Sequence, residues 1–114
     1  MENIPIIIAA TLMDIEKELR SLRLWSSDML SADALASTQP FAIDTMSFPQ
    51  WLQFIFLPRM QFLLQQQLPL PVNCSIAPMA EQYFAPLRLH SAPLVNHLRQ
   101  IDNLLSTAND LKKM

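Results

Sequence analysis

Arg59 is a charged residue inside a strongly apolar stretch of the chain. A helix through this stretch would place three apolar residues on the same face, at offsets of three, four and seven: Phe56, Leu63 and Leu52. An arginine covered by such a face needs a carboxylate, because an unpaired buried charge is very costly. The acids that precede and follow it are Asp44 and Glu81. The pattern favours a structural ion pair, and it leaves open an arginine that recognises an anion in a groove or one that points to solvent.

Polar residues also surround an aromatic residue in this part of the sequence. The aromatic residue is Trp51, and the polar ones are Gln39, Asp44 and Gln53. Together with Arg59 and Glu81 they form a candidate binding or structural cluster. A groove floored by Trp51 and rimmed by such groups could orient a small polar ligand. The alternative is loop packing and helix capping, because an acid just before a helix start is favoured there. The sequence favours this alternative.

Histidine and cysteine do not form a metal or catalytic motif. His90 and His97 are seven residues apart, so on one helix they would lie roughly 10 Å apart and could not share an ion. Cys74 precedes a predicted helix start, where a thiolate is stabilised, but a small buried apolar residue is the favoured role. The absence of glycine excludes the loops that hold phosphates and dinucleotides. We therefore predict no catalytic residue, no metal and no cofactor.

The candidate residues must be positioned by helices, and the first helix is predicted over residues 4–24. Its apolar residues recur every three or four positions: Ile8, Leu12, Ile15, Leu19 and Leu22. Asn3 can cap its start, and Pro5 suits a first turn. Glu16 and Arg20 are four residues apart and can pair on the opposite face.

Residues 26–46 show no sustained periodicity, although Ser31 could cap one short turn. Phe41, Ile43 and Met46 are too apolar for a free linker. About twenty residues without regular structure are uncommon inside a compact domain. We therefore expect an ordered loop that packs on the helices.

A long second helix is predicted from Ser47 to about Gln66. Ser47, a proline in the first turn and Gln50 make the pattern of a capping box. The helix is apolar nearly all round, which predicts a central helix wrapped by the others. Pro58 removes one hydrogen bond in its middle and predicts a kink there.

Two more helices complete the predicted fold. Ser75 can cap a short helix that ends before Pro86, and the last helix begins near Ser91. The apolar stripe of the last helix comprises Leu94, Leu98, Ile101, Leu105 and Leu111. No segment has the alternation of a strand. We therefore predict one all-α domain over residues 1–114, a compact four-helix bundle with a long ordered loop between the first two helices and a Pro-kinked central helix.

Charge and composition limit the partners and the compartment. The net charge is −2 and the eight basic residues are scattered, which argues against direct nucleic-acid binding. A single cysteine allows no internal disulfide, and the acidic Glu2 is unlike the basic start of a signal peptide. The most apolar stretch, residues 48–57, is about half of the roughly 20 residues that a membrane span needs. We expect a cytoplasmic protein with no membrane partner.

Several short motifs occur in order between residues 37 and 81. They are Ser37-Thr-Gln-Pro-Phe41, Asp44-Thr-Met46, Trp51-Leu-Gln53, Pro58-Arg-Met60, Leu68-Pro-Leu-Pro71, Ile76-Ala-Pro78 and Glu81. In order and spacing this stretch, about 40% of the chain, resembles the YqcC-like family of small bacterial proteins. The resemblance implies a four-helix bundle, a cytoplasmic bacterial protein and no established activity. Some members of that family are labelled tRNA pseudouridine synthase C.

The motif of such a synthase is not present in the sequence. Pseudouridine synthases use a catalytic aspartate, usually preceded by arginine and leucine, in a mixed α/β domain. The most similar tripeptide in this sequence is Arg88-Leu89-His90, which has histidine in place of the aspartate. The synthase activity therefore rests on the family label alone.

The favoured function is a non-enzymatic interaction or accessory protein, with a link to tRNA modification through that label. Its partner would be an unknown protein or a second copy of the chain. With 51% apolar residues in a short chain, some apolar surface should stay exposed and mark a partner, and we expect it on the first or last helix. The alternatives are a small-molecule binding module with a groove around Trp51 and Arg59, and the synthase itself.

Overall fold

The regular structure of the chain is helical. The computed structural model describes residues 3–71 and 75–112, with side chains up to Thr107, so Cys74 and the side chain of Leu111 lie outside the described part. The elements are α1 (Ile4–Ser21), α2 (Ala32–Leu35), the 3-10 helix η1 (Pro40–Ala42), α3 (Phe48–Trp51), the π-helix η2 (Leu52–Phe56), α4 (Leu57–Gln65), α5 (Ile76–Phe84) and α6 (Ala92–Lys112). No strand occurs within these residues, and the prediction of an all-α fold is confirmed.

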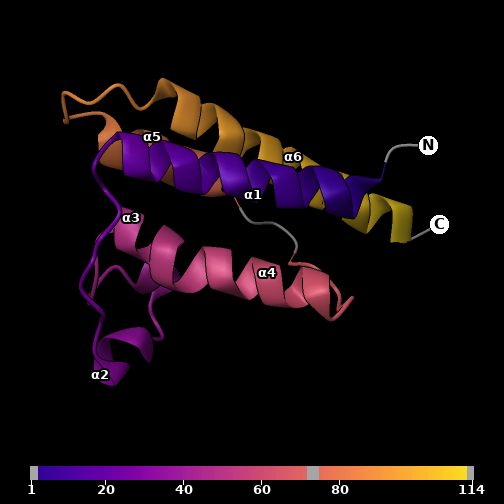
Figure 1. Cartoon of the computed structure of the whole chain (residues 1–114), viewed down its shortest axis with the longest axis horizontal. Helices are drawn as coiled ribbons and strands as arrows, with labels where there is room; N and C mark the ends of the chain where they lie inside the picture. The colour runs from indigo at the N-terminus through magenta and orange to yellow at the C-terminus, as the bar shows by residue number, and fades with distance from the viewer. Residues whose placement is uncertain (1–2, 72–74, 113–114) are drawn as a thin grey trace.

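The helices form two layers. Figure 1 shows α1, α5 and α6 together, with the continuous helix α3–η2–α4 beneath them. The segment that joins α1 to α3, residues 22–47, carries α2 and lies at one end; we call it the α2 loop. Within the upper layer α6 packs against both α1 and α5. The contact of α4 with α1 joins the lower layer to the upper one. Among the described residues, no helix combines the length and apolar character needed to cross a membrane.

The buried core consists of the predicted helical stripes. Four residues of α1 and four of α6 are fully buried: Ile8, Leu12, Ile15, Leu19, Leu94, Leu98, Ile101 and Leu105. The lower layer contributes Leu52, Phe56, Leu57 and Met60 to the same cluster. Because residues three and four apart share a helix face, local spacing was enough to identify the buried positions of α1 and α6.

The helix starts follow the predicted capping residues at three places. The Asn3 side chain accepts from the N–H of Ile6, and the Ser31 side chain caps α2. At the third, Ser47 and Gln50 form a capping box in which each side chain accepts a backbone N–H of the other residue. These local bonds fix where the α2 loop ends and the long helix begins.

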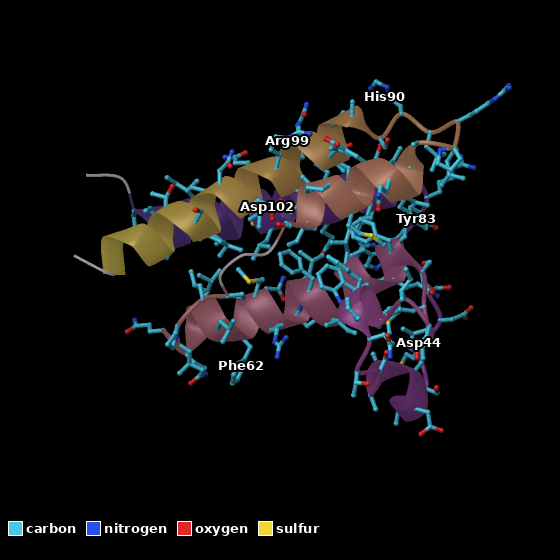
Figure 2. The ribbon with its side chains drawn as sticks, turned by 180° about the vertical axis from the view of Figure 1, so that it is seen from behind. Asp44, Phe62, Tyr83, His90, Arg99 and Asp102 are labelled. Atoms are coloured by element: carbon cyan, nitrogen blue, oxygen red, sulfur yellow. The ribbon has the colours of Figure 1, made fainter. Side chains whose placement is uncertain are left out.

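The long helix differs from its prediction on one face. Met60 is fully buried, but Phe62 is 55% exposed and points away from the upper layer in Figure 2. The expectation that the other helices wrap it is therefore wrong, because α4 forms an outer layer. The helix runs through Pro58, and the Leu57 N–H bonds to the Leu52 carbonyl across the wider π-helical turn. Such a turn gives room for a proline ring that would clash with the carbonyl of residue 54.

Two helices end in the left-handed conformation without glycine. Arg23 follows α1 with a φ of 61°, and Gln67 follows α4 with a φ of 55°. At each end the next N–H returns to a carbonyl five residues back, from Leu24 to Leu19 and from Leu68 to Leu63. This is the Schellman arrangement, in which glycine is the usual residue because it has no Cβ.

Candidate functional site

Trp51 lies at the centre of an aromatic cluster at one end of the long helix. Its ring centroid is 4.8 Å from that of Phe41 on η1, 5.4 Å from that of Phe56 and 6.0 Å from that of Phe48. Phe41 reaches it from a strained backbone, since its φ is 56° and that of Ala42 is 49°. The cluster thus ties the loop that carries Phe41 to the start of the long helix.

A groove of about 250 Å³ opens beside this cluster, and we call it the Trp51 groove. The long helix provides one side with Trp51, Ile55, Phe56, Arg59 and Met60. The other side comprises Pro40, Phe41, Pro71 and Ile76. Eight of the nine residues are apolar, and Arg59 is the charged one. The groove is partly open to solvent.

Arg59 does not form the ion pair that the sequence predicted. Its side chain is exposed. Within the described part of the chain, the salt bridges are Arg20 with Glu16 and Arg99 with Glu81. The prediction is wrong because Arg59 projects at the rim of the groove, where water solvates a guanidinium, and no covered apolar face forces it to find a carboxylate.

The two predicted partners of Arg59 are engaged elsewhere. The Asp44 carboxylate accepts a hydrogen bond from the Ser37 hydroxyl at 2.5 Å, inside the loop. Glu81 on α5 pairs with Arg99 on α6. Figure 2 shows Asp44 in the loop at the opposite side of the molecule from Arg99. Gln39 is exposed, and its backbone N–H donates to the Ser37 hydroxyl.

Gln53 is a buried anchor of the loop. Its side-chain carbonyl accepts the N–H of Ser26 at 2.8 Å, and its side-chain amide donates to the Ser26 carbonyl at 2.8 Å. The backbone N–H and the backbone carbonyl of Ser26 are therefore both satisfied by the Gln53 side chain. Of the predicted cluster, the structure brings only Trp51 and Arg59 together in the Trp51 groove.

Asp102 on α6 holds the start of α5, a role that the sequence analysis assigned to Ser75. The Asp102 carboxylate accepts the N–H groups of Ile76 at 2.9 Å and Ala77 at 2.8 Å. Ser75 has a φ of 37°, and its side chain makes no capping bond. Figure 2 places Asp102 where α5 begins. In the sequence, Asp102 directly follows Ile101 of the predicted apolar stripe, and this was the available signal, since an acid beside a buried face needs donors.

The histidines lie on the upper layer, away from the Trp51 groove. His90 is exposed before the start of α6, and His97 is half-buried on that helix. Across the residues that the structure describes, no three His, Cys, Asp or Glu side chains come close enough to share a metal ion.

This arrangement of helices matches a known structure. The solution NMR structure of YqcC from Escherichia coli has a TM-score of 0.80 to this chain at 31% sequence identity, over 92% of this chain and 90% of that one. The profile of the DUF446 family, described as tRNA pseudouridine synthase C, matches residues 7–104. The chain belongs to this family. The YqcC-like resemblance seen in residues 37–81 therefore extends over most of the chain.

The relatives of this YqcC-like chain are either small proteins, most of which it covers, or a much longer one, of which it covers a small part. "Uncharacterized protein YqcC" of E. coli is 35% identical over 95 residues, which are 83% of this chain and 87% of that protein. An "Uncharacterized protein" of Haemophilus influenzae is 41% identical over 71 residues, 62% of this chain and 67% of that one. A "tRNA pseudouridine synthase C" of Pectobacterium carotovorum is 44% identical over 64 residues, 56% of this chain but only 17% of that protein.

Proposed function

We propose that this YqcC-like chain is a non-enzymatic accessory subunit that binds a tRNA pseudouridine synthase. One observation carries the proposal. A segment similar to this chain lies within a much longer Pectobacterium protein that is named tRNA pseudouridine synthase C. A similar segment makes up most of the small E. coli protein YqcC. We infer from this shared segment that the small protein and the synthase act in one assembly.

The structure supports a binding role through the chemistry that its surface offers. The Trp51 groove contains no acid that could act as a general base or nucleophile. Its apolar lining suits a polypeptide partner. Arg59 and Trp51, which line it, are of the residue types that contribute most to protein interfaces. A tRNA-modifying partner also fits the predicted cytoplasmic location.

The proposal is tested by mixing this chain with the purified tRNA pseudouridine synthase C of the same organism. We expect a complex in sedimentation velocity, and we expect pseudouridine in a tRNA substrate only when the synthase is present. The chain alone should form none. Pseudouridine formed by the chain alone would support the enzyme alternative, and absence of a complex at micromolar concentrations of both proteins would contradict the accessory role.

A small-molecule binding module is the second candidate, and the Trp51 groove is the observation in its favour. Trp51 and Arg59 line it. Gln39, Asp44, Gln53 and Glu81 do not line it. Native mass spectrometry of the purified chain tests this candidate, since a bound ligand would add mass that a variant in the groove loses.

A further inference from the structure

The Trp51 groove combines an apolar surface with a single cation. Its lining includes Arg59 and no acidic residue. Arg59 has no ion-pair partner among the described residues, as is also true of Arg23 and Arg88, but of these three arginines only Arg59 lines the groove. The complementary ligand therefore has an apolar part and a carboxylate a few ångströms from it, because a guanidinium binds a carboxylate with two parallel hydrogen bonds.

The size of the groove favours a polypeptide segment over a free small molecule. Its volume is about 250 Å³, and it is partly open to solvent. Sites for small ligands usually enclose about 300–1,000 Å³ and bury most of the ligand surface. An open groove of this size accepts one or two apolar side chains of a segment whose backbone stays outside, as in the docking of an amphipathic helix.

The groove is already shaped before a partner arrives. Three aromatic rings surround the Trp51 indole at centroid distances of 4.8–6.0 Å. Phe41 and Ala42 hold the facing loop in the left-handed region, which costs free energy for residues with a Cβ and persists only where the surroundings enforce it. A pre-formed site binds more tightly because little side-chain freedom is lost on association.

We propose that the Trp51 groove is the docking site for a segment of the pseudouridine synthase in which an apolar side chain and a carboxylate lie within one helical turn of each other. The apolar side chain packs against Trp51 and Phe41, and the carboxylate pairs with Arg59. This inference rests on the proposed accessory function, and it names the surface and the partner chemistry that this function would use.

The test compares two charge reversals of equal size. Arg59→Glu places a carboxylate at the rim of the groove, and Arg88→Glu makes the same change on an exposed residue between α5 and α6, outside the groove. Each variant is titrated into the purified full-length synthase by calorimetry. We expect Arg59→Glu to raise the Kd at least tenfold and Arg88→Glu to change it less than threefold. Circular dichroism and urea unfolding check that both variants fold like the parent chain.

A second readout reports on the groove directly. The chain has two tryptophans, so the indole N–H region of an NMR spectrum contains two signals. We expect the Trp51 signal to shift when unlabelled synthase is added, while the Trp25 signal, from outside the groove, stays in place.

The possible outcomes separate the two proposals. A complex that Arg59→Glu leaves intact, with no Trp51 shift, would overturn the groove assignment and leave the accessory function standing. No complex with the parent chain would overturn both. A dimer of the chain that Arg59→Glu dissociates would assign the groove to a second copy, and a co-purified small molecule lost in that variant would assign it to a ligand.

Discussion

Gln53 on the long helix and Ser26 in the loop after α1 exchange two hydrogen bonds, each 2.8 Å long, across 27 residues of sequence. Ser26 is half-buried, so water cannot fully replace Gln53. Replacing Gln53 by methionine keeps the length of the side chain but leaves one N–H and one carbonyl unsatisfied. We expect the free energy of unfolding to fall by about 1–3 kcal/mol in urea denaturation.

The matched control for Gln53 is Gln61→Met, the same exchange at an exposed position of α4. It should change the free energy of unfolding by less than about 0.5 kcal/mol. Equal effects of the two substitutions would mean that the Ser26 clamp contributes nothing to stability.

Asp102→Ala should release the start of α5. The carboxylate accepts the first two N–H groups of that helix, which then lose their partner while remaining partly shielded from water. We expect a loss of about 1–3 kcal/mol and faster hydrogen exchange in the first turn of α5. Asn103→Ala, on the exposed neighbour, is the control. Unchanged exchange in Asp102→Ala would show that α5 does not depend on this cap.

Gln67→Gly should stabilise the chain. Gln67 has a φ of 55° at the end of α4, a conformation that glycine adopts without a Cβ penalty. The expected gain is about 0.5–1 kcal/mol, reduced by the extra freedom of glycine in the unfolded state. Gln61→Gly, inside α4, should instead destabilise by about 1 kcal/mol. A loss of stability in both variants would contradict the assigned backbone conformation.

Arg59→Met should leave stability nearly unchanged. A buried ion pair at this position would cost about 3–5 kcal/mol when broken. Because Arg59 is exposed and its predicted partners are bound to Ser37 and Arg99, we expect a change within about 0.5 kcal/mol in urea unfolding. A loss of several kcal/mol would restore the structural ion pair that the sequence favoured.

Local patterns predicted the helices and the caps at Asn3, Ser31 and Ser47, because these depend on residues three or four apart, whereas the cap expected from Ser75 was wrong. Ile8 and Leu12, or Ser47 and Gln50, lie close to each other on any helix of this sequence. The family motifs in residues 37–81 likewise identified the fold and the family, because they lie in one continuous stretch of the sequence. Ile6 and Met13 on the first helix are 65% and 73% exposed, and a partner surface on that helix stays a prediction.

The candidate site was predicted less well because its contacts join distant segments. Asp102 and Ile76 are 26 residues apart, and Gln53 and Ser26 are 27 apart. No periodicity relates such pairs. Arg59 was assigned a partner because its neighbours in sequence are apolar, but the outer position of α4 exposes it. The two helix ends at Arg23 and Gln67 were not predicted either, because both residues adopt the left-handed conformation that glycine usually takes.

The cap that α6 provides to α5 has a consequence for the order in which the chain matures on the ribosome. A helix of nine residues is marginal by itself in water, and α5 receives its first two acceptors from a residue made about 25 positions later. Synthesis proceeds from the N-terminus, so α5 has no cap until Asp102 has emerged. Ile76, at the first turn of α5, is also part of the Trp51 groove. The Trp51 groove therefore reaches its final form only after Asp102 of α6 has been made, and a partner of the kind proposed above would bind after α6 has emerged rather than to the segments made before it.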